Sequence, residues 1–245
     1  MNSNLNLHAL AAPSLAQSHT DSINLSAAAH LLVRVAPYPT MDAGDLIELF
    51  WDGCYVASRV LADGDAGRAV SLRVPESFIA NGCSRIHYRV MQVGQAPALS
   101  APLSVVVKLD CPGGPPSAGF NDENQRLAPV GLPETIRRQG VNPNQIKRGI
   151  PLTIEPYLNM AVDDEITLRW GDVRVDLPPL KARDIDRPVQ VWVPPTVIDE
   201  AGEDLRLEVT YCILDRVGNN SRWAPARRLR IGCRAPTASE NTEAL

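Results

Sequence analysis

The chain has 245 residues, a formal net charge of −4 and a sequence pI of about 5.6. Proteins that bind nucleic acid need a basic face to neutralise phosphates, so this charge balance argues against a nucleic-acid partner. The sequence also lacks an apolar run of about 18 residues, and we therefore expect no membrane insertion.

Residues 1–28 are rich in Ser, Asn, Ala and Gln and contain no aromatic residue. This composition predicts a flexible N-terminal arm. The segment has no basic residues ahead of its short apolar stretch, which argues against a cleaved secretory signal. We therefore expect the protein to be cytoplasmic, or exported by a route that does not depend on a signal peptide.

The central feature of the sequence is an internal repeat with an offset of 119 positions. Residues 31–53 align without a gap with residues 150–172, and residues 70–82 align with 189–202. The matched pairs in the first segment are Pro37 and Pro156, Tyr38 and Tyr157, Met41 and Met160, Asp45 and Asp164, Ile47 and Ile166, Leu49 and Leu168, and Trp51 and Trp170. The chain therefore contains two copies of one domain.

The repeat and the Pro/Gly content divide the chain into parts. We predict a first domain at 29–109, a Pro/Gly-rich linker at 110–130, a second domain at 131–235 and a flexible tail at 236–245.

Within each copy the apolar residues alternate with polar ones. Ile166, Leu168 and Trp170 form one face of a segment whose other face is polar, which is typical of a half-buried strand. About seven such segments per copy, with Pro and Gly between them, predict an all-β fold. The second copy has an extra segment, in which 132–136 reads as an edge strand and 142–144 as a turn.

Two resemblances follow from these patterns. Short strands at this spacing, with a Trp on a middle strand and a Tyr on the penultimate one, resemble an immunoglobulin-like sandwich. The run from Pro37 to Trp51, with its counterpart in copy two, resembles the tandem immunoglobulin-like repeats of large, mostly uncharacterised, adhesin-like proteins of pseudomonads and related bacteria. That resemblance implies two tandem antiparallel β-sandwiches with a binding or spacing role.

Copy two carries the residues that we single out as a candidate binding surface. Trp192 alternates out of phase with its apolar neighbours, and Trp223 follows a polar loop; neither has a counterpart in copy one. Trp and Arg are enriched where interfaces concentrate their energy. The candidate residues are Trp192, Trp223, Arg222, Arg228 and Arg230. For the arginines, a solvated outer strand and an anion site are the two interpretations.

Catalytic and metal-binding patterns are weak. The acidic runs lack the twelve-residue calcium-loop spacing, and no phosphate-binding Gly loop or nucleophile elbow occurs. The five cysteines do not recur at equivalent positions, which predicts that most of them are reduced, partly buried thiols and do not form a disulfide framework. We therefore expect no enzymatic activity, no cofactor and no metal site.

These observations favour a module that binds or spaces a protein partner. One alternative is a carbohydrate-binding module that uses Trp192 and Trp223, which would require a coplanar exposed platform. The other is an adaptor or accessory protein of a bacterial toxin-delivery system.

Overall fold

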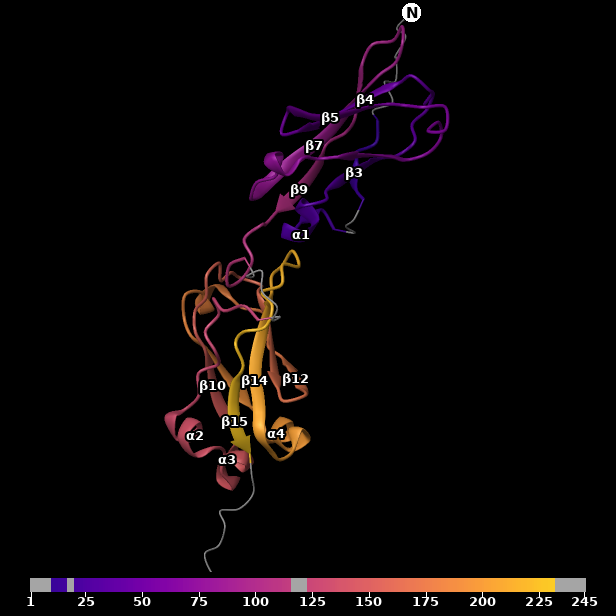
Figure 1. Cartoon of the computed structure of the whole chain (residues 1–245). Helices are drawn as coiled ribbons and strands as arrows, with labels where there is room; N and C mark the ends of the chain where they lie inside the picture. Colours follow the sequence, from indigo (N-terminus) through magenta and orange to yellow (C-terminus); the bar gives the residue numbers. More distant parts are fainter. Residues whose placement is uncertain (1–9, 17–19, 116–122, 232–245) are drawn as a thin grey trace, which may run out of the picture. The chain divides into compact units, whose positions relative to one another are not determined.

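The computed structural model describes residues 10–16, 20–115 and 123–231 and divides the chain into two compact units, Met1–Asp110 and Cys111–Leu245 (Figure 1). Each unit is a β-sandwich of two sheets with a hydrophobic core between them, and every described strand pair is antiparallel except β2 with β9. The predicted all-β, tandem immunoglobulin-like class is confirmed. The expected tail 236–245 lies outside the described residues.

Unit 1 packs a three-stranded sheet, in the order β1-β3-β6, against a larger sheet in the order β2-β9-β7-β4-β5, with β8 paired to β7. Its elements are β1 (Ser14–Leu15), β2 (Ser22–Ile23), α1 (Leu25–Ala28), β3 (Leu32–Val35), β4 (Leu46–Trp51), β5 (Cys54–Val60), β6 (Val70–Arg73), β7 (Gly82–Met91), β8 (Ala98–Leu99) and β9 (Leu103–Val107), with a 3₁₀ turn at Glu76–Phe78.

Unit 2 packs the pair β10-β13 against a four-stranded sheet in the order β12-β11-β14-β15. Its three helices gather at the end of the sandwich where β14 begins and β15 ends (Figure 1). Its elements are α2 (Glu134–Gln139), α3 (Pro143–Arg148), β10 (Ile150–Ile154), β11 (Glu165–Trp170), β12 (Val173–Asp176), β13 (Val189–Val193), α4 (Pro195–Ala201), β14 (Asp204–Leu214) and β15 (Arg227–Ile231), with a 3₁₀ turn at Ala182–Asp184.

The alternation of apolar residues places the same ring at the centre of both cores. Trp51 is 3% exposed and Trp170 is fully buried, each at the end of the strand that carries the repeat signature. Because alternate residues of a strand point to opposite faces, the Trp170 ring follows Ile166 and Leu168 into the space between the two sheets.

The segment expected as a flexible arm instead contributes to unit 1 in its described part. Leu10, Leu15 and Ile23 are buried in the core, where Ile23 is fully inaccessible. β1 pairs with β3, and β2 pairs in parallel with β9, so both segments also cover strand edges. The lack of aromatic residues suggested a flexible segment, but the buried aliphatic side chains of Leu10, Leu15 and Ile23 hold its described part to the core.

The segment expected as a linker is also different in its described part, because it belongs to unit 2. Leu127 and Val130 are buried in the core of that unit. The Gly113 amide donates to the Leu158 carbonyl at 2.7 Å, and the Tyr211 hydroxyl donates to the Ala128 carbonyl at 2.9 Å. Pro and Gly exclude regular strands here, but they do not prevent the intervening side chains from being buried.

The extra segment of copy two forms helices rather than the predicted edge strand and turn. Residues 132–136 lead into α2, and Asn142 caps α3 by accepting from the Gln145 amide at 3.0 Å. The Gln145 side chain accepts from the Asn142 amide in return, which completes a capping box, and Pro143 occupies the first helical turn.

Candidate functional site

Among the described residues of unit 2, the most exposed aromatic side chain lies on a strand with a free edge. Trp192, on β13, has 57% of its surface exposed, whereas its neighbours Val191 and Val193 are buried in the core. Pro151 of β10 lies directly opposite Trp192. The indole therefore stands on the outer face of the two-stranded sheet, as the out-of-phase alternation predicted.

The backbone of β13 presents donors and acceptors to its unpaired side. Thr153 of β10 exchanges both of its backbone hydrogen bonds with Gly131, at 2.7 and 3.0 Å. Residues opposite one another in an antiparallel pair alternate between bonded and non-bonded pairs. Gln190 lies opposite Thr153, so the N–H and C=O groups of Gln190 and, two residues on, of Trp192 point away from β10. Among the described residues these groups have no backbone partner.

Prolines bound this free edge. Pro188 precedes the first residue of β13, and Pro194 follows the last. Proline has no backbone N–H and cannot continue a ladder of main-chain hydrogen bonds.

Trp223 lies in a different environment. Its ring is partly buried, and the Arg169 guanidinium lies 5.0 Å from the ring centroid. Arg169 alternates with the buried Leu168 and Trp170, which places it on the outer face of the four-stranded sheet. Trp192 is on the outer face of the other sheet. The two tryptophans are therefore on opposite faces of the sandwich and do not form one platform.

The three candidate arginines are also separated by their contacts. Arg222 has a backbone φ of 61° and its amide donates to the Asn220 side chain at 2.7 Å, so it belongs to the turn before Trp223. Arg228 is exposed on β15 and forms an ion pair with Glu208 at 2.9 Å. Arg230, two residues further along the same outer face, borders a depression next to α2.

The outer face of unit 1 carries an aromatic cluster that sequence reasoning missed. The rings of Phe50 and His87 are stacked, with centroids 5.0 Å apart and planes inclined by 8°, and Tyr55 meets Phe50 edge to face. Arg89 lies 5.4 Å over the Phe50 ring. A depression of about 510 Å³ lies next to this cluster and is lined in part by His87 and Leu99.

The sequence shows only that Phe50 falls on the polar side of its strand. It does not show that His87 is the cross-strand neighbour, because that follows from the register between β4 and β7. Arg169 stands at the position of Phe50 in unit 2, so the two units present different side chains on equivalent faces.

A buried tyrosine–aspartate pair recurs in both units. The Tyr38 hydroxyl donates to Asp45, and the Tyr157 hydroxyl donates to Asp164, each at 2.8 Å. Burial first, and then the neighbouring carboxylate, raises the pKa of both tyrosines above the ordinary value of about 10. In each unit the same carboxylate also accepts a hydrogen bond from a backbone amide of the preceding loop, from Asp42 at 3.2 Å and from Ala161 at 3.0 Å, so the pair stabilises that loop.

We next consider metal-binding groups, thiols and membrane-spanning helices among the described residues. Within the described ranges no group of three or more His, Cys, Asp or Glu side chains is arranged to hold a metal ion. Cys54, Cys83, Cys111 and Cys212 are free thiols, but the expected partial burial is wrong for Cys54 and Cys83, which are exposed; Cys233 lies outside the described residues. No helix in the described part of the chain has the length and apolarity to cross a bilayer.

Several solved structures of proteins with tandem domains resemble this chain at low sequence identity. No family model and no curated protein matches it. Its structure is similar to a segment involved in host-cell surface retention of a 1.5-MDa bacterial ice-binding adhesin, with a TM-score of 0.40, 13% identity and coverage of 91% of this chain and 64% of that one. The chain thus spans less than two thirds of that structure.

Two further solved structures are similar. One comprises fibronectin(III)-like modules of Clostridium thermocellum CbhA, with a TM-score of 0.41, 8% identity and coverage of 95% and 100% of the two chains. The other is a bacterial immunoglobulin-like domain of the M. primoryensis ice-binding adhesin, with a TM-score of 0.29, 20% identity and coverage of 41% and 99%.

Proposed function

We propose that this chain is a non-catalytic tandem immunoglobulin-like module that binds a partner protein by strand addition at the free edge of β13. The observation that carries the proposal is the combination of outward-pointing backbone groups at Gln190 and Trp192 with an exposed indole at the same place.

The physical basis is the usual division of roles in β-strand addition. Main-chain hydrogen bonds to an unpaired edge supply sequence-independent affinity, and side-chain contacts supply specificity. Trp192 offers a large, stiff apolar surface, and tryptophan is among the residue types that most often dominate interface energy. The Trp192 ring is available for this role because Pro151, and not another large side chain, lies opposite it.

A selected peptide ligand tests the proposal in the full chain. Peptides are selected from a displayed library against the wild-type protein, and their affinities for variants are measured by titration calorimetry. Trp192→Ala should weaken binding by more than about 1 kcal/mol. Gln190→Pro removes one outward N–H, which is worth about 0.5–1.5 kcal/mol, without breaking a bond within the sheet.

Two matched controls are available. One separates the effect of the Gln190 backbone N–H from that of its side chain, and the other compares the edge of β13 with the equivalent edge of unit 1. Gln190→Ala removes the side chain and its contact with Thr153 but keeps the N–H, so it should bind like wild type. Ser71 occupies the equivalent position on the outer strand β6 of unit 1. Ser71→Pro should leave binding unchanged. Full affinity of both Trp192→Ala and Gln190→Pro would refute the proposal.

A further inference from the structure

A depression of about 280 Å³ in unit 2 lies between α2 and the neighbouring ends of β14 and β15. The buried side chains of Ile136 and Leu229 contribute to its lining, and it is surrounded by arginines. These are Arg137 and Arg138 of α2, Arg206 of β14, and Arg228 and Arg230 of β15. It is on the four-stranded sheet, not on the sheet that carries the β13 edge.

The fold brings these arginines together by two features. Arg206 precedes the buried Leu207, so the alternation of β14 places it on the outer face beside β15, and the register shift between Asp204 and Leu207 leaves Leu205 exposed as well. The chain after α2 then runs along β15, where the Val141 amide donates to the Arg230 carbonyl at 2.8 Å. A Cβ atom at Gly140 would lie 2.8 Å from the same carbonyl oxygen, so glycine permits this approach.

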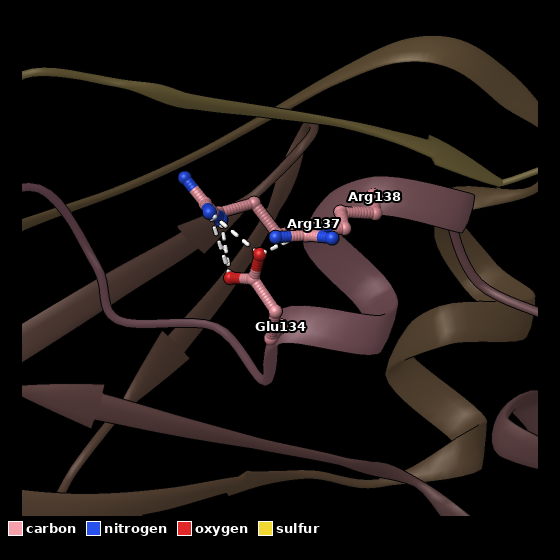
Figure 2. Close-up of polar contacts among 3 residues, drawn as sticks. All are labelled: Glu134, Arg137 and Arg138. Carbon is pink, nitrogen blue, oxygen red and sulfur yellow. Dashed lines mark hydrogen bonds and ion pairs between the residues drawn. The ribbon is translucent and has the colours of Figure 1, made fainter.

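The arginines of α2 are held in place by one carboxylate. Figure 2 shows Glu134 facing Arg137 and Arg138; Arg137 donates two hydrogen bonds to it, at 2.7 and 2.8 Å, and Arg138 donates a further one. The hydrogen bond from Arg137 lowers the pKa of Glu134, so this carboxylate stays ionised.

Positive charge exceeds negative charge around the depression. Glu134 and Glu208 are each engaged by arginines, and Asp204 accepts a hydrogen bond from the Arg206 backbone amide. The side chains of Arg206 and Arg230 have no carboxylate partner among the described residues. Five guanidinium groups thus face this region of a chain whose net charge is −4.

We propose that this depression binds a small, multiply charged oxyanion, such as a diphosphate or a sulfated saccharide unit. The guanidinium group presents its donors in a planar fork that matches phosphate and sulfate oxygens. The volume is close to the lower end of protein ligand pockets, about 300 Å³, which suits a compact anion. Glu134 orients the guanidinium groups of Arg137 and Arg138 before the ligand arrives, which lowers the entropy cost of binding through their remaining N–H donors.

The test uses the full chain and inorganic pyrophosphate in titration calorimetry at an ionic strength of about 0.1 M. Arg206→Ala and Arg230→Ala should each weaken pyrophosphate binding by roughly tenfold, because each removes a charge-assisted contact. Arg216, exposed beyond the far end of β14, supplies the control. Arg216→Ala removes the same charge but should change the affinity by less than about twofold, since exposed charges are screened over about 10 Å at 0.1 M salt.

A sulfated disaccharide is titrated in a parallel arm. Tighter binding of the disaccharide identifies a saccharide as the source of the oxyanion, and tighter binding of pyrophosphate identifies a phosphorylated ligand. Thermal unfolding of each variant without ligand checks that it folds. The proposal is overturned if neither anion binds, or if Arg206→Ala and Arg230→Ala bind both anions as tightly as Arg216→Ala does. Either outcome would leave the proposed peptide binding at the β13 edge unaffected, because that edge belongs to the other sheet.

Discussion

Leu127 provides a sharp test of where unit 2 begins. Its side chain is 2% exposed and packs in the core of that unit, although the sequence around it reads as a linker. Replacing a buried Leu by Ala typically costs about 2–5 kcal/mol, and a domain of this size has about 5–15 kcal/mol of stability. Leu127→Ala should therefore remove a large fraction of the unfolding free energy of unit 2 and leave unit 1 unchanged.

Tryptophan fluorescence during urea denaturation makes this measurable in the full chain. Three of the four tryptophans are in unit 2 and only Trp51 is in unit 1, so fluorescence mainly reports the unfolding of unit 2. The midpoint of that transition should fall in Leu127→Ala with little change in its slope. Leu158→Ala is the matched control because the Leu158 side chain is 62% exposed. Equal midpoints for the two variants would show that the segment before residue 131 is not part of unit 2.

Trp170→Ala should cost about 3–5 kcal/mol and abolish or strongly weaken the unit 2 transition while unit 1 still unfolds cooperatively; an unchanged circular-dichroism melt would contradict the core position of the ring. Alkaline pH should destabilise both units, because burial raises the pKa of Tyr38 and Tyr88 in unit 1 and of Tyr157 and Tyr211 in unit 2. Stability is fully present below the unfolded value of about 10 and falls above it by up to about 1.4 kcal/mol per pH unit for each tyrosine, since only the unfolded state releases the proton. Chemical denaturation between neutral pH and about pH 11 measures this loss, and Tyr211→Phe should reduce the slope for unit 2.

The strands were predictable because their signal is local. Alternation with a period of two identifies the core face of each strand, and the duplicated Pro, Tyr, Asp and Trp positions locate the same strand in both copies. The burial of Trp51 and Trp170 follows from that pattern alone.

The helices of unit 2 were missed because each is too short to show a period of 3.6 residues. α2 and α3 have six residues each, and α4 has seven. Signals for α3 were nevertheless present in the sequence, since Asn142, Pro143 and Gln145 form a capping box with proline in the first turn. A turn and a capped helix begin with the same residue types, and only the packing of Ile146 against the core distinguishes them.

Surface sites were the least predictable part. The exposure of Trp192 followed from its phase in the strand, but Trp223 and the Phe50–His87 stack depend on which residues face each other across strands. The arginine-lined depression depends further on how α2 and the chain after it lie against β15. Pairing register is set by the assembled sheet, so no local pattern in the sequence encodes these contacts.

The prolines on either side of β13 limit what its free edge can hold. With Pro188 and Pro194 at its ends, the strand offers only Val189–Val193 for pairing, a length of about 17 Å at roughly 3.3 Å per residue. An unprotected edge of greater length would allow copies of the protein to join into a growing sheet. Here the edge has room for one short segment, and main-chain pairing cannot extend beyond the prolines. The same two prolines therefore shorten the pairing that a second copy of the protein could make with this edge, and they set the length of any segment that the edge can accept.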